Sequence, residues 1–138
     1  VPAEVDGIDL APITQGTQSV STRHIVSVFA TDREHCYQLA VTDGRWKYLW
    51  FPEGAKEQLF DLTNDPDELK NLAADPGAAD AKAELRRALI DELTAKNSPY
   101  LHDGQLMQTP VQDDPPGFRG AHRFPGFSLE HSDRWGWP

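Results

Sequence analysis

One segment, residues 41–72, constrains the fold of this chain more than any other. At its start, two runs of β-branched and aromatic residues, 38–42 and 45–51, flank the dipeptide Asp43-Gly44. Asp-Gly between such runs is a strong signal for a two-residue β-hairpin, because both turn positions need a positive φ. The segment therefore predicts two antiparallel strands joined by a tight turn.

Two further strands extend this hairpin. Residues 52–56 carry a second turn signal, and residues 58–62 follow as a short strand. Before the hairpin, the run from Ile25 to Thr31 is β-branched and aromatic and contains no helical break. Together these segments predict an antiparallel meander of four strands.

Helical signals follow the strands. Asp65-Pro66-Asp67-Glu68 combines a capping side chain, a proline and a glutamate in the order that favours a helix start, and Asp75-Pro76 repeats the signal. From Asp80 to Lys96, apolar residues recur on one helical face. That face comprises Leu85, Ala88, Leu89 and Leu93, and the opposite face comprises Glu84, Arg87 and Asp91. We expect an α+β fold, in which this C-terminal helix packs on one face of the four-stranded antiparallel sheet and an irregular Pro/Gly-rich tail follows.

The most aromatic strand predicts that both faces of the sheet are apolar. Trp46, Tyr48 and Trp50 fall on one face and Leu49 and Phe51 on the other, because strand side chains alternate. One helix covers one face only, and a large exposed aromatic patch is unusual on a soluble monomer. Two covers for the other face stay open: the tail, or a second domain or chain. The tail carries the aromatic residues Phe118, Phe124, Phe127, Trp135 and Trp137.

Composition divides the chain into three zones. We expect residues 1–22 to form an irregular connector from an upstream domain, residues 23–97 to hold the regular structure, and residues 98–138 to form the tail. The tail holds six of the 11 prolines and five of the 10 glycines, so it should form neither helix nor sheet for any length. A length of 138 residues with 38% hydrophobic content supports one modest core.

Charge and cysteine content restrict the partners and the compartment. A net charge of −9 argues against nucleic acid or an anionic membrane as a partner, since both would repel the chain. No apolar run approaches the length of a membrane span, and no secretory signal precedes the first strand. The start at Val1 rather than Met suggests processing or a fragment. The single cysteine, Cys36, excludes an internal disulfide and favours a reducing, cytoplasmic compartment, while a periplasmic one stays open.

Three sequence blocks carry a resemblance to a known family. They are Thr42-Asp43-Gly44-Arg45-Trp46-Lys47-Tyr48, then Glu57-Gln58-Leu59-Phe60-Asp61-Leu62, then Asn64-Asp65-Pro66-x-Glu68-x-x-Asn71-Leu72. In this order and spacing they resemble the C-terminal subdomain of sulfatases, the formylglycine-dependent hydrolases of the alkaline-phosphatase-like superfamily. The resemblance spans residues 4–106, and residues 5–12 are similar to the connector that leaves the catalytic domain of that family.

This resemblance implies that the catalytic groups belong to an upstream domain of an α/β parent enzyme. The family's nucleophile is a Cys or Ser in a Cys/Ser-x-Pro-x-Arg context, converted to formylglycine. Cys36 is followed by Tyr-Gln-Leu-Ala and therefore lacks that context. Formylglycine and calcium, a cation that binds oxygen ligands, are thus implied for the upstream catalytic domain, and no cofactor is expected in this chain.

Other residue types that could bind a metal or an anion lack a supporting context. Asp113-Asp114 is an Asp-Asp pair in the Pro-rich tail, and we interpret it as part of a solvated loop. Lys47 and Lys56 do not correspond to the family's sulfate-binding cations, which lie upstream. The remaining histidines, His24, His122 and His131, show no spacing typical of zinc ligands.

Three residues are candidates for substrate binding. In a subgroup of bacterial arylsulfatase-like proteins, a Gly-Glu-His motif at a strand edge occupies the position of Glu34 and His35, although Arg33 replaces the glycine here. If that edge faces the catalytic cleft, His35 could hydrogen-bond the leaving group of a substrate. The alternative is a turn histidine paired with a neighbouring carboxylate. His102, in His102-Asp103-Gly104, is a second candidate for the pocket rim.

Two hypotheses for the function follow. In the first, the chain is the C-terminal part of a sulfuric ester hydrolase, completing the fold and forming one wall of the active site without catalysing alone. Relatives in this superfamily also hydrolyse phosphate or phosphonate esters, which leaves the ester class open. In the second, the chain is a non-enzymatic binding module that uses the aromatic face of Trp46, Tyr48 and Trp50 for an apolar or sugar ligand.

Overall fold

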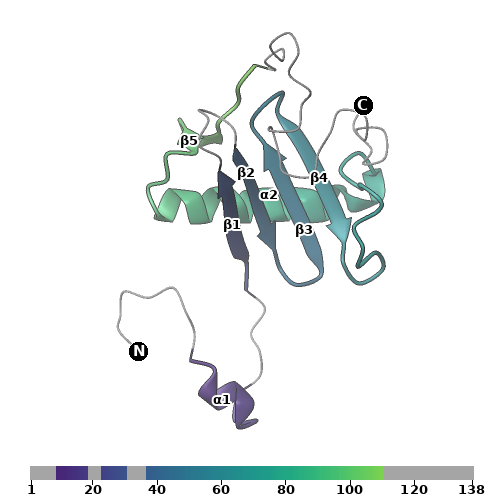
Figure 1. Ribbon diagram of the computed structural model, residues 1–138, viewed down its shortest axis with the longest axis vertical. Coiled ribbons are helices and arrows are strands. Elements are labelled where there is room, and N and C mark those ends of the chain that lie inside the picture. The colour runs from purple at the N-terminus through teal and green to yellow at the C-terminus, as the bar shows by residue number, and fades with distance from the viewer. Residues whose placement is uncertain (1–8, 19–22, 31–36, 111–138) are drawn as a thin grey trace, which may run out of the picture.

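The computed structural model describes residues 9–18, 23–30 and 37–110. Its centre is a four-stranded antiparallel sheet in the order β1-β2-β3-β4, which confirms the predicted meander (Figure 1). The strands are β1 (Ile25–Ala30), β2 (Tyr37–Thr42), β3 (Trp46–Phe51) and β4 (Lys56–Asp61). Each strand lies within one or two residues of its predicted bounds, because the period-two alternation of apolar residues marks strands directly.

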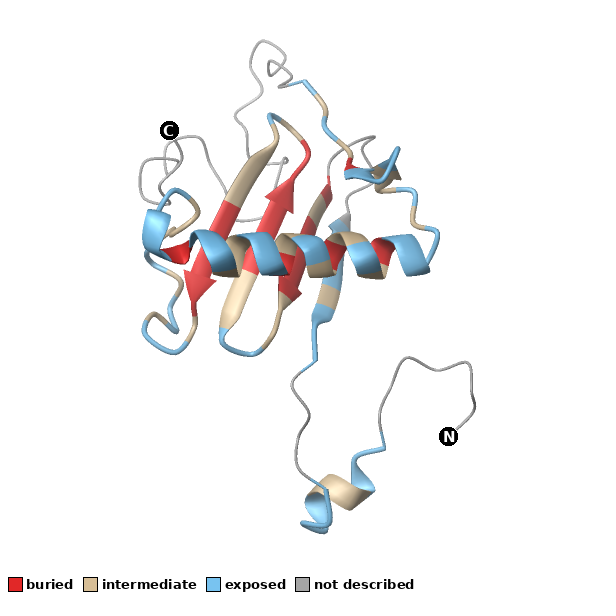
Figure 2. Ribbon diagram, turned by 180° about the vertical axis from the view of Figure 1, so that it is seen from behind, coloured by how far each residue is buried: buried red, intermediate tan, exposed pale blue. Residues whose placement is uncertain are grey.

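The long helix packs across one face of this sheet, as predicted. A 3-10 turn, η1 (Pro76–Ala78), leads into α2 (Ala79–Ala95), and the Asp75 side chain accepts a hydrogen bond from the Gly77 backbone N–H at 2.8 Å. Leu85, Leu89 and Leu93 are buried in one cluster with residues of β2, β3 and β4. Figure 2 shows α2 lying across the sheet. The α+β arrangement is therefore confirmed. None of the helices in the described part of the chain has the length and hydropathy needed to cross a membrane.

The two faces of the sheet are both apolar. On the side of α2, the core includes Tyr48, Trp50, Leu39 and Leu59, each at most 2% exposed. On the other side, a second cluster consists of Ala40, Leu49, Phe51 and Phe60, with Leu62 packed against it. The alternation along β3 therefore falls as the sequence predicts. The aromatic residues of the predicted tail that were candidates to cover the second face lie outside the described residues.

The predicted helix start at Asp65–Glu68 is wrong. Residues 66 and 67 form a turn, and the next helical element along the chain is the 3-10 turn that begins at Pro76. The Asp65 carboxylate instead accepts hydrogen bonds from the backbone N–H groups of Leu69 at 3.0 Å and Lys70 at 2.8 Å, four and five residues along the chain, and so closes a loop. Glu68 has φ 55°, a left-handed conformation that a right-handed helix does not contain.

The turn between β2 and β3 also differs in detail from the prediction. Of Asp43 and Gly44, only Gly44 has a positive φ, at 95°. The central residues are Gly44 and Arg45, because Asp43 N–H bonds to the carbonyl of Trp46 at 3.3 Å. The Asp43 carboxylate accepts from the N–H groups of Arg45 and Trp46 at 2.8 and 2.7 Å. Asp43 therefore closes the turn with its side chain.

Two short elements were not foreseen. The connector contains a four-residue helix, α1 (Ala11–Thr14), with no buried residue. The start of the predicted tail forms a hairpin of two-residue strands, β5 (Leu101–His102) and β6 (Gln105–Leu106). Its turn, Asp103-Gly104, has φ 48° and 72°, the positive values that an Asp-Gly hairpin turn requires. Figure 1 shows β5 beside the end of the sheet where β1 ends and β2 begins.

Candidate functional site

Residues of the three sequence blocks meet at the end of the sheet that carries the β2–β3 turn. The Asp61 carboxylate accepts hydrogen bonds from the Arg45 guanidinium at 3.1 Å, the Asn64 amide at 2.9 Å and the Thr63 backbone N–H at 3.2 Å. The Arg45 hydrogen bond, aided by the bonds from Asn64 and Thr63, lowers the pKa of Asp61 below its ordinary value. Asp61 is therefore charged, and its carboxylate connects the turn at Arg45 to the turn at Thr63 and Asn64. We interpret this ion pair as a structural one.

An ion pair fixes the third block to the first. Lys47 Nζ lies 2.8 Å from both carboxylate oxygens of Glu68. Both side chains are about one-third exposed, at 31% each, so solvent screens the attraction. The pair places Glu68 at the point where the chain turns back along β4. Lys47, which the sequence did not assign to sulfate binding, is thus bonded within its own subdomain.

Asn71 covers the outer edge of β4. Its side-chain oxygen accepts hydrogen bonds from the backbone N–H groups of Leu59 at 3.1 Å and Ala73 at 3.0 Å. The Leu72 N–H then donates to the Leu59 carbonyl at 2.8 Å. A strand edge presents unpaired backbone groups, and this loop satisfies those of β4 without adding a further strand.

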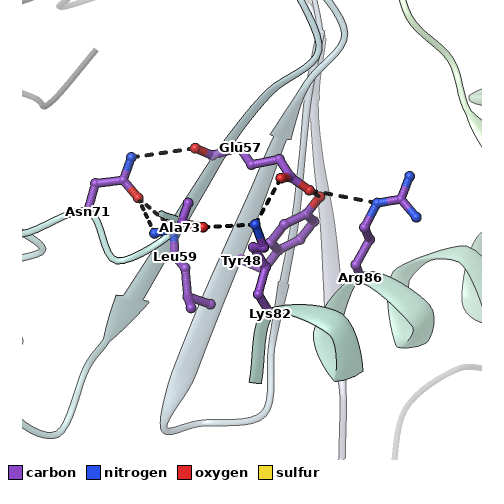
Figure 3. Close-up of polar contacts among 7 residues, drawn as sticks. All are labelled: Tyr48, Glu57, Leu59, Asn71, Ala73, Lys82 and Arg86. Carbon is purple, nitrogen blue, oxygen red and sulfur yellow. Dashed lines mark hydrogen bonds and ion pairs between the residues drawn. The ribbon is translucent and has the colours of Figure 1, made fainter. Parts of the chain in front are cut away.

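Glu57 is the centre of a polar cluster between β3, β4 and α2 (Figure 3). Its carboxylate accepts a hydrogen bond from the Tyr48 hydroxyl at 2.8 Å, and lies 3.4 Å from Lys82 Nζ and 3.7 Å from Arg86 Nε. Lys82 also donates to the Ala73 carbonyl at 2.8 Å. Burial, together with the hydrogen bond to Glu57 and its charge, raises the pKa of Tyr48.

The chemistry of this cluster is structural. A general base needs a carboxylate that is open to a reacting proton, but three donors from its own subdomain already surround the Glu57 carboxylate. The Arg86 guanidinium also lies 5.8 Å from the centre of the Trp50 ring, which adds a cation–π contact. The cluster therefore anchors α2 to the sheet. Sequence reasoning did not single out Glu57 or Asn71 for these roles, although both stand in the blocks that carry the family resemblance.

The opposite end of the sheet is formed by other elements. We call it the hairpin end: β1 ends and β2 begins there, and it carries the β3–β4 turn (residues 52–55) and the β5–β6 hairpin. Trp50 Nε1 donates to the Met107 carbonyl at 3.1 Å, and Thr109 N–H donates to the Pro52 carbonyl at 2.9 Å. Leu106 is buried. These contacts hold the hairpin against the sheet.

Tyr37 connects β2 to the hairpin end. Its ring centre lies 4.4 Å from that of Tyr100, at an interplanar angle of 41°. The Tyr37 side chain is 6% exposed, yet its hydroxyl is the buried side-chain polar atom without a hydrogen-bond partner among the described residues. Burial, and then the proximity of Tyr100, raises the pKa of Tyr37 to about 12. No sequence signal identified this residue.

Of the three predicted substrate-binding residues, the structure describes His102. Glu34 and His35 lie outside the described residues, but the residues that flank their segment, Ala30 and Tyr37, are paired in the β1–β2 register at the hairpin end. His102 is 83% exposed on β5, with Nε2 3.4 Å from the Asp103 carboxylate. The fold thus brings both ends of the Glu34–His35 segment and His102 to the same end of the sheet.

The metal candidates can be placed only in part. Within residues 9–18, 23–30 and 37–110, no group of three or more His, Cys, Asp or Glu side chains could hold a metal ion. Cys36, Asp113-Asp114, His122 and His131 lie outside these ranges. His24 is exposed at the start of β1.

The binding-module hypothesis is not favoured by the structure. Tyr48 and Trp50 are 0% and 2% exposed beneath α2, and Trp46 is half-buried beside them. An aromatic surface for a ligand must be open to solvent, whereas this one is the core of the subdomain.

Comparisons with known proteins give the family. No protein-family model matches the chain. It is 38% identical over 107 residues to the Delta 4,5-hexuronate-2-O-sulfatase of Bacteroides thetaiotaomicron, a match covering 72% of this chain and 21% of that protein. It is 31% identical over 110 residues to an arylsulfatase of Clostridium perfringens, covering 78% of this chain and 22% of that protein. The chain thus spans about a fifth of the length of these relatives.

Solved structures agree. A Bacteroides thetaiotaomicron protein assigned to the sulfatases superposes with a TM-score of 0.67 at 36% identity, covering 84% of this chain and 24% of that chain. A 2-O GAG sulfatase superposes with a TM-score of 0.66 at 33% identity, covering 85% and 28% respectively. In each case a minor part of the larger protein reproduces the sheet and helix described above. The chain therefore corresponds to the C-terminal part of the sulfatase fold.

Proposed function

We propose that this chain completes the fold of a sulfuric ester hydrolase and forms one wall of its active site, without catalysing the reaction alone. The observation that carries the proposal is the match to about a fifth of each sulfatase relative. Hydrogen bonds between the three sequence blocks also support it. The residues on which the resemblance depends hold the subdomain together.

The catalytic groups are assigned to the remaining part of the enzyme. The sulfatase relatives imply a parent enzyme with a metal and a cofactor, and we propose that these are calcium and formylglycine in an upstream catalytic domain. The described residues of this chain do not fit a metal, since they contain no group of three suitable ligands. We therefore derive no catalytic step from this chain.

The hairpin end is the part of the chain that we assign to the active-site wall. His102 is exposed there, and the segment with Glu34 and His35 joins the sheet at the same end. An imidazole can donate or accept a hydrogen bond near neutral pH, so His35 or His102 can meet a polar leaving group of a sulfate ester. Glu34, which precedes His35 in the sequence, has a carboxylate that can accept a hydrogen bond from a polar group of the substrate.

Activity measurements test whether catalysis requires the upstream domain. We expect the 138-residue chain alone to show no turnover of a generic aryl sulfate with calcium present, and the chain joined to its catalytic domain to hydrolyse it. Stabilisation of the transition state needs groups outside this chain. Calcium-dependent hydrolysis by the pure chain would contradict the proposal.

Histidine variants of the assembled enzyme test the wall. His35→Ala and His102→Ala should each lower kcat/KM for a bulky sulfate ester by about tenfold, the effect of losing one hydrogen bond of roughly 1.4 kcal/mol. His24→Ala is the matched control, because His24 is an exposed histidine at the opposite end of the sheet. Equal activity of all three variants on bulky and small esters would remove the hairpin end from the active site.

A further inference from the structure

The two outer edges of the sheet differ in how far described residues cover them. Along β4, the loop of residues 62–75 satisfies the edge through Asn71 and Leu72. Along β1, no described residue forms a backbone hydrogen bond to the outer edge, and no described strand pairs with it. Native proteins usually cover or charge a strand edge, because an open one is a template for pairing with another chain.

The side chains of β1 make this edge apolar as well as open. Ile25 is 53% exposed, Val28 44% and Phe29 45%. The register places Ile25 and Phe29 on the side of the second apolar cluster and Val28 on the side of α2. The strand reads IVSVFA and contains no charged residue or proline, although the chain as a whole carries a net charge of −9. Exposed apolar surface of this kind marks an interaction site.

The described residues that precede β1 are exposed as well. The helix α1 has no buried residue, and Leu10 beside it is 61% exposed. The relatives contain about four-fifths of their length outside the part that this chain matches. That remaining part of the fold is therefore large enough to cover both β1 and the connector.

From these observations we infer that β1 is the seam where the subdomain joins the catalytic domain of its sulfatase. The partner surface is apolar where it meets Ile25, Val28 and Phe29, and it supplies backbone groups or a strand to the open edge of β1. The inference rests on the proposed function, which assigns the chain to a sulfatase. It adds the surface through which the two parts meet.

Hydrogen exchange in the assembled enzyme tests the seam directly. We expect the backbone amides of residues 25–30 to be protected at least a hundredfold more strongly in the assembled enzyme than in the 138-residue chain. The loop around Leu69 is the internal control, because Leu69 is 70% exposed and lies beyond the opposite edge of the sheet. Amides of β1 that exchange at the same rate in both forms would overturn the inference.

Matched substitutions give a second measurement. Ile25→Lys and Phe29→Lys each place a charge on the seam, whereas Leu69→Lys makes the same change at an exposed apolar residue elsewhere. We expect the β1 variants to lower the Tm of the assembled enzyme by 5 °C or more and Leu69→Lys to change it by less than 1 °C. Equal shifts for the three variants would contradict a seam at β1.

The remaining outcomes distinguish the seam from a dimer interface and from a failure of the proposed function. If the isolated chain sediments as a dimer that Phe29→Lys dissociates, and β1 stays unprotected in the assembled enzyme, the partner is a second copy and the inference is wrong. If β1 is protected but the assembled enzyme hydrolyses no sulfate ester, the proposed function fails and the seam stands. If the enzyme is active and β1 exchanges freely, only the seam fails.

Discussion

Two tyrosines of this chain, Tyr37 and Tyr48, are both buried, but their hydroxyl groups have different surroundings. The Tyr48 hydroxyl donates to the Glu57 carboxylate, which also lies near two cationic side chains from α2. The Tyr37 hydroxyl, by contrast, is buried without a hydrogen-bond partner among the described residues. A hydrogen bond to a charged acceptor adds stability, whereas an unsatisfied buried hydroxyl costs free energy of desolvation. The same atom type therefore contributes with opposite sign at the two positions.

Replacing each tyrosine by phenylalanine should reveal this difference. We expect Tyr48→Phe to lower the free energy of unfolding by about 2 kcal/mol, since it removes a charge-assisted hydrogen bond. Tyr37→Phe should raise it by about 1 kcal/mol, since it removes a buried hydroxyl that has no partner among the described residues. Urea unfolding followed by tryptophan fluorescence measures both values. A larger loss for Tyr37→Phe than for Tyr48→Phe would contradict the hydrogen-bond assignment.

The same phenols make stability depend on alkaline pH. Burial raises the pKa of Tyr37 from 10.0 to about 12, and the pKa of Tyr48 is raised further in the same direction. Above pH 10 the unfolded chain therefore loses phenolic protons that the native chain retains, so the free energy of unfolding falls as pH rises through this range. Urea midpoints between pH 8 and 11.5 should decrease above pH 10, and less so in Tyr48→Phe. A flat profile in wild type would show that both phenols titrate as in the unfolded chain.

Among the secondary-structure elements, the loop of residues 62–75 has the most unusual role. Its composition is that of a helix start, but no helix forms, and the Asp65 carboxylate bonds to the N–H groups of Leu69 and Lys70 in a loop. At Glu68 the backbone is left-handed, with φ 55°. Its continuation alongside β4 satisfies backbone groups that would otherwise face solvent at an open edge. The element therefore acts as a cover for a strand.

Asn71 should be the critical residue of that cover. Asn71→Ala removes the acceptor of the Leu59 and Ala73 N–H groups, so we expect it to lower the free energy of unfolding by about 1–3 kcal/mol. Asn64→Ala is the control at an exposed asparagine with one described side-chain hydrogen bond, to Asp61, and should cost less. Thermal unfolding by circular dichroism compares the two variants. Equal losses would show that the β4 edge does not depend on Asn71.

For the whole molecule, a sheet with two apolar faces and an open β1 edge predicts marginal stability in isolation. Binding to a partner that recognises only the folded state adds about 2.7 kcal/mol when the partner is present at 100 times its Kd. We therefore expect the isolated chain to bind a hydrophobic dye and to melt at a lower temperature than the same subdomain in the assembled enzyme. Calorimetry of both forms is the measurement, and a sharp, dye-free transition of the chain alone at the same temperature would contradict it.

The candidate site could be predicted from the sequence only in part. His102 was identified from its residue type and context, and it is exposed at the hairpin end. The roles of Tyr37 and Glu57 were missed, because nothing local distinguishes a buried phenol or a bonded carboxylate from a solvated one. The proposed roles of Glu34 and His35 stay predictions, since both residues lie outside the described part of the chain.

The sequence by itself determined the four strands, the long helix and the apolar faces of each. Local periodicity of apolar residues predicts those features, because it indicates which side of an element is buried. Only the tertiary structure decided the path of residues 62–75, the β5–β6 hairpin and the burial of Trp50 beneath α2. Each depends on contacts between residues far apart in the chain, such as the hydrogen bond from Trp50 to Met107, 57 positions away. Such contacts leave no periodic pattern, because their energy arises only when the packed elements bring the two groups together.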